Sequence, residues 1–252
     1  MKIRKLLSNS MLFRITLKVL IILIPLLMLG SFLIYQTITE QLTAEVKSKL
    51  KQEVRLKANN IDKIIENQLS KVELITDNEA VTSLEPQRIE PYFNRIISRN
   101  NDIWSHFLIT NGEGTEIVHS EGEEHYGKNI AHKEYFKVPY NTGEAVIAEP
   151  TFSTSTGRKI MGIGYPLKID GETKGVLAGF VRLSYLTKIL NDENNLSQHS
   201  YSFILNSNGR VAAHPEQKKV LSRNWLNPEQ DQKSDTELSQ QEINNMSQGF
   251  KE

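Results

Sequence analysis

The sequence of 252 residues contains no cysteine. This absence excludes disulfide frameworks, thiolate metal sites and cysteine nucleophiles. The chain also has no net charge, because 30 basic residues balance 30 acidic ones. Nucleic-acid binding usually needs a basic surface, so no nucleic-acid partner is expected.

Motifs that carry catalysis are missing as well. The chain has no G-x-x-x-x-G-K-[ST] phosphate loop, no H-E-x-x-H zinc motif and no nucleophile elbow. One segment is rich in groups that bind metals: His119, Glu121, Glu123, Glu124, His125 and His132. Their spacing matches no helix-borne metal motif, and the segment is typical of a loop. We therefore predict a protein that is not an enzyme and holds neither cofactor nor metal.

The charges are unevenly placed along the chain. Residues 1–35 hold five basic residues and no acidic one, and residues 19–35 hold no charge at all. A helix of roughly 20 apolar residues crosses the ~30 Å hydrocarbon layer of a membrane. The pattern predicts a transmembrane helix over residues 17–36 that follows a tip of residues 1–16. A cleaved signal peptide is the alternative, but the apolar run is long and no small-x-small cleavage site follows it.

The same charges predict the orientation. Basic residues stay on the cytoplasmic side of a membrane, so the N-terminus is expected inside and the bulk of the chain outside. No second apolar run of about 18 residues follows. The expected protein is single-pass in the cell membrane, with the lipid bilayer as one partner.

A long helix is predicted over residues 37–80. Residues 36–78 contain neither glycine nor proline, and apolar residues recur every three or four positions. This spacing is typical of an amphipathic helix. Its apolar stripe has two interpretations, packing against the chain's own globular part or pairing with a second copy in a homodimer. The Glu85-Pro86 and Glu90-Pro91 pairs are expected to interrupt helix beyond it.

The remaining sequence predicts an α+β fold. Strands are expected at residues 103–110, 115–120, 146–148, 159–169 and 174–183. Short helices are expected at residues 134–138 and 184–190, the second capped by Ser184. Sequential strands joined by tight turns, with the helices set apart, indicate an antiparallel sheet.

A partial repeat suggests two modules. The hairpin around Asn111-Gly112 is echoed about 96 residues later by the hairpin around Asn208-Gly209. We assign residues 81–192 to a membrane-distal module and residues 193–252 to an incomplete membrane-proximal one. Residues 236–246 have a helix-like, glutamine-rich sequence.

The order of four local motifs resembles a known family. They are residues 127–130 with 132–137, Glu149-Pro150 with 153–158, Tyr165-Pro166 with 175–177, and residues 208–211 with 213–215. Together they resemble the double Cache domain, a tandem PAS-like extracytoplasmic sensor found in chemotaxis receptors, sensor kinases and diguanylate cyclases. The likeness covers roughly residues 36–220.

The resemblance implies a ligand pocket in the distal module. Relatives that bind amino acids hold the ligand carboxylate with an arginine and aromatic residues, and the ammonium with an acid late in the domain. By position, the arginine falls on Lys133, the aromatic residues on Tyr135 and Phe136, and the late acid on Phe180. The groups that would hold a carboxylate are kept as a cation and aromatic residues, but the acid that would hold an ammonium group is replaced by Phe180. The expected ligand is therefore a small organic anion such as a carboxylate.

The candidate site therefore combines cations with aromatic walls, as small-molecule pockets commonly do. The candidates are Tyr135, Lys133, Phe136, Trp104, Tyr165, Phe180 and Arg158. Tyr135 is the first choice for a ligand contact. Phe136, Phe180 and Tyr165 also suit a plain apolar core, and Lys133 also suits an exposed position.

The predicted function is the ligand-sensing region of a transmembrane bacterial receptor, a methyl-accepting chemotaxis protein in the first instance. Ligand binding is expected to relay a conformational change to a cytoplasmic output domain that this chain does not contain. The alternatives are the sensor half of a histidine kinase or diguanylate cyclase, and a truncated, membrane-tethered binding protein.

Overall fold

The computed structural model describes residues 11–191, 201–222 and 224–225. The chain divides into two compact units, Met1–Asn59 and Asn60–Glu252. The helix-like residues 236–246 lie outside the described residues.

Helix α2 (Met11–Thr76) is continuous over 66 residues and contains Pro25. It covers both the predicted membrane span and almost all of the predicted long helix. Between Ile15 and Thr76 it is long and apolar enough to cross a membrane. Pro25 lacks a backbone donor, a loss that membrane helices tolerate. From Ile15 to the end of the first unit the apolar side chains of this helix are exposed.

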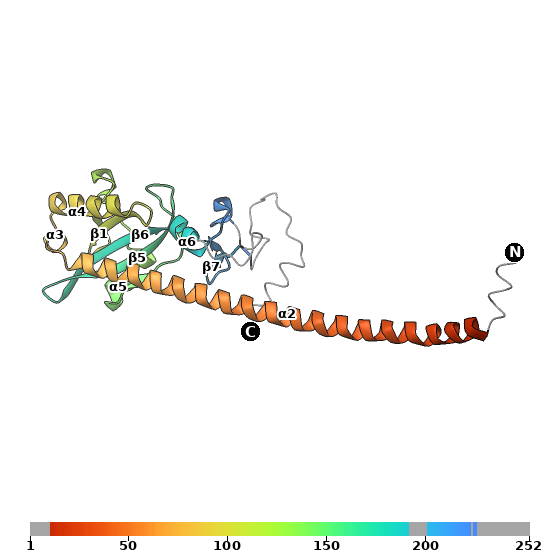
Figure 1. Ribbon diagram of the computed structural model, residues 1–252. Coiled ribbons are helices and arrows are strands. Elements are labelled where there is room, and N and C mark those ends of the chain that lie inside the picture. The colour runs from red at the N-terminus through yellow and green to blue at the C-terminus, as the bar shows by residue number, and fades with distance from the viewer. Residues whose placement is uncertain (1–10, 192–200, 223, 226–252) are drawn as a thin grey trace. The chain divides into compact units, whose positions relative to one another are not determined.

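The second unit is built on a six-stranded antiparallel sheet (Figure 1). The sequence predicts the antiparallel arrangement and five of the strands, but not the short strand Thr151–Phe152. Its strands are β1 (Trp104–Asn111), β2 (Glu116–His119), β3 (Val146–Ile147), β4 (Thr151–Phe152), β5 (Lys159–Ile169) and β6 (Glu172–Arg182). The order is β2-β1-β6-β5-β3, and β4 pairs with β5. The β5–β6 turn uses Asp170 and Gly171, with φ of 54° and 82°, values that suit an Asp-Gly hairpin turn.

Short helices connect and cover these strands. They are α3 (Glu79–Thr82), α4 (Pro86–Arg99), η1 (Glu123–His125), α5 (Glu134–Thr142), α6 (Leu183–Leu190) and η2 (Gln217–Lys219). Asn78 caps α3 by accepting a hydrogen bond from the Ala80 N–H at 3.0 Å. Helix α5 ends at Gly143, whose φ of 71° is the left-handed conformation that glycine adopts readily.

Two local predictions about helices are wrong. The Glu85-Pro86 pair interrupts helix as predicted, since Glu85 is extended and α4 begins at Pro86, but Glu90-Pro91 does not, because α4 runs through both residues. A first-turn proline costs no hydrogen bond, and burial of Ile89 and Phe93 secures the rest of the helix. Ser184 does not cap α6, since that helix begins one residue earlier and its N-cap is Arg182.

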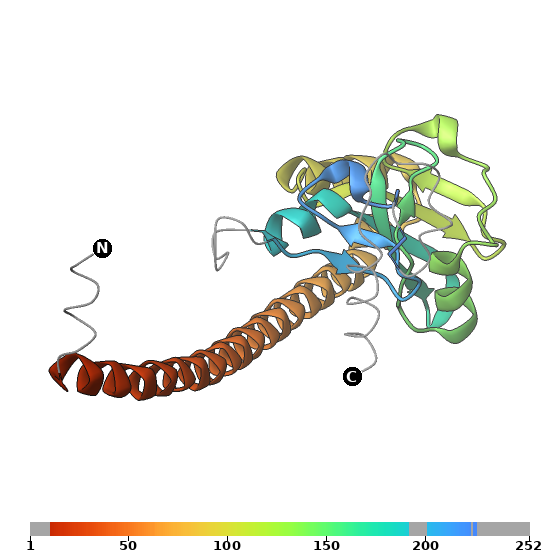
Figure 2. The ribbon, with the colours of Figure 1, turned by 90° about the vertical axis from the view of Figure 1, so that its right-hand side faces the viewer.

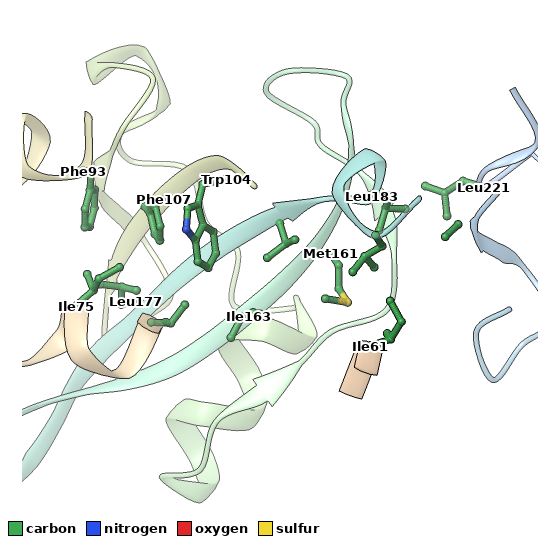
Figure 3. Packing of buried hydrophobic residues seen from close by; sticks show 14 of the residues in the cluster. Ile61, Ile75, Phe93, Trp104, Phe107, Met161, Ile163, Leu177, Leu183 and Leu221 are labelled. Atoms are coloured by element: carbon green, nitrogen blue, oxygen red, sulfur yellow. The ribbon is translucent and has the colours of Figure 1, made fainter. Parts of the chain in front are cut away.

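One face of the sheet carries the main core. A bulge between Trp104 and His106 sets the alternation of β1, so that Trp104, Phe107 and Ile109 share this face. The end of α2 covers it through Val72 and Ile75. Phe107 lies 4.8 Å from Trp104 and 5.2 Å from Phe93 of α4 between ring centroids, and the three rings lie side by side in Figure 3.

The opposite face carries a smaller cluster beneath α5. Its members are Leu108, Ile130, Phe136, Ile160, Val176, Ala178 and Phe180. Helices α4 and α5 therefore lie on opposite sides of the sheet (Figure 2). Glycine lets α5 approach closely, because a Cβ on Gly164 of β5 would lie 1.9 Å from the Tyr135 carbonyl oxygen.

A second hairpin follows α6, as the repeat predicts. It pairs β7 (Ile204–Leu205) with β8 (Val211–Ala213). Glu149, just before β4, accepts hydrogen bonds from Asn206 and from the Ser207 hydroxyl, the latter at 2.9 Å. The loop around β4 is thus joined directly to the turn of this hairpin.

Candidate ligand-binding site

A cavity of about 60 Å³ lies on the α5 face of the sheet. A water-sized group needs roughly 10–15 Å³ on this measure, so the cavity suits a small molecule. Its apolar wall includes Phe180, which stacks on His106 at 4.2 Å between centroids. Tyr135 meets Phe180 edge-on at 5.0 Å. The first turn of α5 and the middle of the sheet therefore form one continuous aromatic wall.

Three histidines form a row along the cavity. Ring centroids of His106 and His119 lie 5.1 Å apart, and those of His119 and His125 lie 4.2 Å apart. The Nδ1 atom of His119 accepts the Glu121 backbone N–H at 3.1 Å, and Nδ1 of His125 lies 2.7 Å from the Lys128 ammonium. A neutral imidazole whose Nδ1 accepts carries its hydrogen on Nε2. His119 and His125 are therefore hydrogen-bond donors through Nε2.

The same tautomers bear on metal binding. The ligand atoms of His119, Glu121 and His125 lie within 4.8 Å of one another. Metal-bound histidine normally donates its second ring N–H to an acceptor, whereas here both Nδ1 atoms accept. Glu121 also pairs with Arg158 at 3.5 Å. This arrangement fits a set of hydrogen-bond donors better than a metal centre.

Burial keeps the rings of His106 and His119 neutral. Burial, and after it the charges of His119, Arg158, His125 and Arg182, lower the pKa of His106 to about 3. Burial, followed by His125 and Lys128, lowers the pKa of His119 to about 3. A proton on either ring would lie in a poorly solvated place among other positive groups.

This pKa shift predicts acid sensitivity. The pKa of His119 is lowered from its ordinary value of 6.5 to about 3 by folding. Between these two pH values the unfolded chain binds more protons than the folded one, so the stability of the fold decreases as the pH is lowered. We expect His119→Asn, which keeps an acceptor for Glu121, to lose less stability than the wild type between pH 7 and pH 5. His132→Asn, at an exposed position, should match the wild type. Urea unfolding of the full chain in detergent measures both, and parallel pH profiles for wild type and H119N would contradict the assignment.

Two lysines supply positive charge to the cavity. Lys128 and Lys133 both line it. Lys133 is the N-cap residue of α5 but makes no side-chain capping bond, and its ammonium has no ion-pair or hydrogen-bond partner within the described residues. A half-buried cation without a partner is suited to bind an anion.

A hydroxyl-rich loop forms another wall. Thr151, Ser153, Thr154 and Ser155 line the cavity. The buried Ser153 side chain lies 2.9 Å from the Ser155 hydroxyl and accepts the Thr156 N–H at 3.1 Å. The loop is thereby closed into a turn that holds several hydroxyl groups at the cavity.

One acid lies among these cations. Glu116 of β2 lines the cavity, is only 6% exposed and has an Oε2 atom that is buried without a hydrogen-bond partner among the described residues. Burial raises its pKa to about 7, and Lys128 opposes this shift. Burial and then the charge of Glu116 raise the pKa of Tyr135.

The structure brings together three of the seven predicted site residues, Tyr135, Lys133 and Phe180. Arg158 is exposed beside the cavity and pairs with Glu121. The other three predicted residues do not line the cavity.

Phe136, Trp104 and Tyr165 each have another packing role. Phe136 stacks on Tyr140 at 5.3 Å between centroids. Trp104 packs in the core of the opposite face. Tyr165 also lies on that face, where its hydroxyl donates to Glu73 of α2 at 2.7 Å.

Sequence reasoning missed Glu116, His106 and His119 as site residues. The available signal was a polar residue next to large apolar ones within a strand. Glu116 precedes Ile117 and Val118 in β2, and His106 precedes Phe107 and Leu108 in β1. A polar residue at a core-facing strand position is a candidate for a site.

Comparison with known proteins identifies the family. A profile of the Cache domain family dCache_1 matches residues 37–249. The chain belongs to the Cache domain family. The methyl-accepting chemotaxis protein PscA of Pseudomonas syringae pv. tomato is 25% identical over 182 residues, 72% of this chain. The chain spans only 28% of the length of that relative.

Solved Cache domains of chemoreceptors share the fold. The ligand-binding domain of Pseudomonas fluorescens CtaA, in complex with L-serine, has a TM-score of 0.55 and 18% identity, covering 72% of this chain and 78% of that one. The domain of Pseudomonas aeruginosa PctC, in complex with GABA, has a TM-score of 0.56 and 20% identity, covering 76% and 86%. These likenesses confirm the α+β Cache fold that the sequence motifs predict.

Proposed function

We propose that this Cache domain is the sensing region of a chemotaxis receptor and that its cavity binds a small organic carboxylate. The observation that carries the proposal is the set of hydrogen-bond donors in the cavity, where Lys133 and Lys128 lie with the Nε2–H group of His119. The relation to PscA supports the receptor class. The complexes of CtaA with L-serine and of PctC with GABA support a small carboxylate as ligand.

The direct test is ligand binding by the full chain in detergent micelles. We expect thermal stabilisation by short carboxylates, and none by amines that lack a carboxylate. At a ligand concentration of 100 Kd the stabilisation is about 2.7 kcal/mol. Stabilisation by simple amines, with no effect of any carboxylate, would refute the proposal.

Replacing Lys133 by alanine is expected to weaken carboxylate binding roughly tenfold or more, because a charge-assisted hydrogen bond contributes about 1.5–3 kcal/mol. Lys137→Ala is the matched control, since Lys137 belongs to the same helix but is exposed and does not line the cavity. Titration calorimetry compares the two variants. Equal affinities would move the carboxylate subsite away from Lys133.

We further propose that residues 17–36 span the cell membrane, with the N-terminus in the cytoplasm and the second unit outside. The five basic residues within residues 1–35 support this orientation. Residues 37–80 would then lead from the bilayer to the distal module of residues 81–192, and residues 193–252 would belong to the proximal module. Ligand binding would favour one arrangement of the module on α2 and so shift a population of receptor states.

The exposed apolar stripe of α2 supports a homodimer. Ile38, Leu42, Val46, Leu50 and Val54 are all exposed in the first unit. We expect Val46→Cys to form a disulfide-linked dimer on mild oxidation in membranes, because paired helices bring equivalent seam positions together. The native chain has no cysteine, so the cysteines introduced at position 46 are the only ones that can form a disulfide. Ser48→Cys, on the opposite side of the helix, is the control, and equal cross-linking of both variants would argue against a defined seam.

A further inference from the structure

A second cavity, of about 240 Å³, lies within the second unit where the second hairpin meets α2 and the sheet. Its apolar walls include Ile61 and Ile65 of α2, Met161 of β5, Leu186 of α6 and Ala212 of β8. All of these except Ile65 are buried, and Met161 and Ile61 lie close together in Figure 3. The cavity therefore reaches into the main core.

Hydrogen bonds hold the walls of this cavity in place. The Ala148 N–H donates to the Gly162 carbonyl at 2.8 Å, which fixes the loop after β3 on β5. The His214 N–H donates to the Thr187 hydroxyl at 3.4 Å, which joins the second hairpin to α6. The space between these elements is thus largely preformed, as cavities that bind small molecules usually are.

The polar side chains of the cavity are engaged with one another. Glu149 accepts hydrogen bonds from the Asn206 amide and from the Ser207 hydroxyl, the latter at 2.9 Å. The Oδ1 atom of Asn206 accepts the Arg210 N–H at 2.8 Å. In the described part of the chain no cationic side chain lines the cavity. An anion would therefore lose its hydration, find no cation and meet the Glu149 carboxylate.

Size and lining together indicate the class of ligand. An apolar cavity of about 150 Å³ lined by leucine, isoleucine and phenylalanine stays dry and binds benzene or xenon. The cavity between the second hairpin and α2 is larger than this, and its inner walls are also apolar side chains. A buried water needs about two to four polar partners, which such walls do not supply. Met161 adds a thioether, a group that makes favourable contacts with aromatic rings.

We propose that this cavity binds a small neutral apolar molecule of the size of a substituted benzene. Among the described residues it shares no lining side chain with the cavity proposed to bind a carboxylate. The inference therefore goes beyond the proposed function and does not depend on it. A molecule held here contacts α2, α6 and the second hairpin at once, and so adds apolar contacts between elements that lie far apart in the sequence.

Methyl NMR of Met161 tests the inference with benzene as the probe. The full chain is studied in detergent micelles with its methionines isotope-labelled at the methyl group, and the Met161 resonance is assigned by its loss in Met161→Leu. We expect benzene to shift this resonance until the shift saturates. Met28, exposed in the apolar segment of α2, reports partition of benzene into the micelle and should shift without saturating. Benzoate, which has the same ring and a negative charge, should leave Met161 unmoved.

Ile65→Phe and Leu69→Phe form a matched pair one turn apart on α2. Both side chains are half-buried against the main core, but of the two only Ile65 lines the cavity. Ile65→Phe should fill the cavity and abolish the saturable shift of Met161, whereas Leu69→Phe should keep it. Circular dichroism shows whether both variants are folded. A nuclear Overhauser effect between benzene and the Met161 methyl group of the unsubstituted chain locates the probe without any variant.

The outcomes are distinct. A Met161 resonance that stays in place, or that moves only in proportion to Met28, would overturn the proposal and mean that another segment or a second copy of the chain fills the cavity. Saturation that survives in I65F would place benzene elsewhere, and an equal shift by benzoate would refute the neutral class of ligand. Stabilisation by short carboxylates is measured separately, so either proposal can fail while the other stands.

Discussion

Replacing Trp104 by alanine is expected to destabilise the second unit by about 3–5 kcal/mol, the range found for large aromatic residues deleted from a core. Trp104 is 1% exposed and packs between the sheet, Phe107 and the helices of the main core. For a unit of this size each kcal/mol lowers the melting temperature by roughly 2–4 °C. The expected fall is on the order of 6–20 °C, measured by circular dichroism of the full chain.

The control for this variant is Phe152→Ala. Like Trp104, Phe152 is aromatic, but it lies near the cavity and half of its surface is exposed. Its deletion should lower the melting temperature by only a few degrees. A Trp104→Ala variant that kept its stability but lost ligand affinity would overturn the assignment of Trp104 to the core.

Replacing Gly164 by alanine is expected to have the second large effect. The added Cβ would lie 1.9 Å from the Tyr135 carbonyl oxygen, a backbone atom that can move only if α5 moves. Overpacking of this kind costs about 1–3 kcal/mol or more. Because α5 carries Tyr135 and follows Lys133, we expect ligand affinity to fall along with stability.

Gly162→Ala is the comparison for this experiment. It lies two residues away on the same strand and face, but its Cβ would meet only ring atoms of Phe180 and Tyr135 at 3.2 Å. Side chains adjust more readily than backbone, so the loss of stability should be smaller than for G164A. Equal thermal destabilisation by the two variants would show that α5 adjusts freely on β5.

Much of the fold follows from local sequence signals. The Asp170-Gly171 pair predicts the hairpin of β5 and β6 because its left-handed backbone conformations suit few other residues. The strand alternation of the hairpins is equally local. Helix is interrupted before Pro86 because proline disfavours helix in the residue before it and is itself favoured in the first turn. Pro91 was misjudged because the burial of Ile89 and Phe93 holds the helix through it.

The site was harder to predict because strand register and bulges are not local. Trp104 and His106 differ by two positions, which ordinarily places side chains on one face, but a bulge between them sends Trp104 to the main core and His106 to the cavity. Tyr165 pairs with Leu177, and Gly162 pairs with Phe180. This register separates Tyr165 from Phe180, although both are aromatic residues on neighbouring strands. Lys133 and Tyr135 could be placed together in the candidate site because they are near neighbours in sequence, at the N-cap and in the first turn of α5.

The hydrogen bonds of Glu149 give the loop before β5 two roles at once. The loop that places Ser153 and Thr154 at the cavity is tied through Glu149 to the turn at Asn206 and Ser207. If the proposed site binds a ligand that orders this loop, the second hairpin would be tightened too, and by thermodynamic reciprocity a well-ordered hairpin would raise ligand affinity by the same factor. Affinity would then depend on both hairpins, and a substitution at Asn206, far along the chain from Lys133, is expected to change it without a direct contact to the ligand.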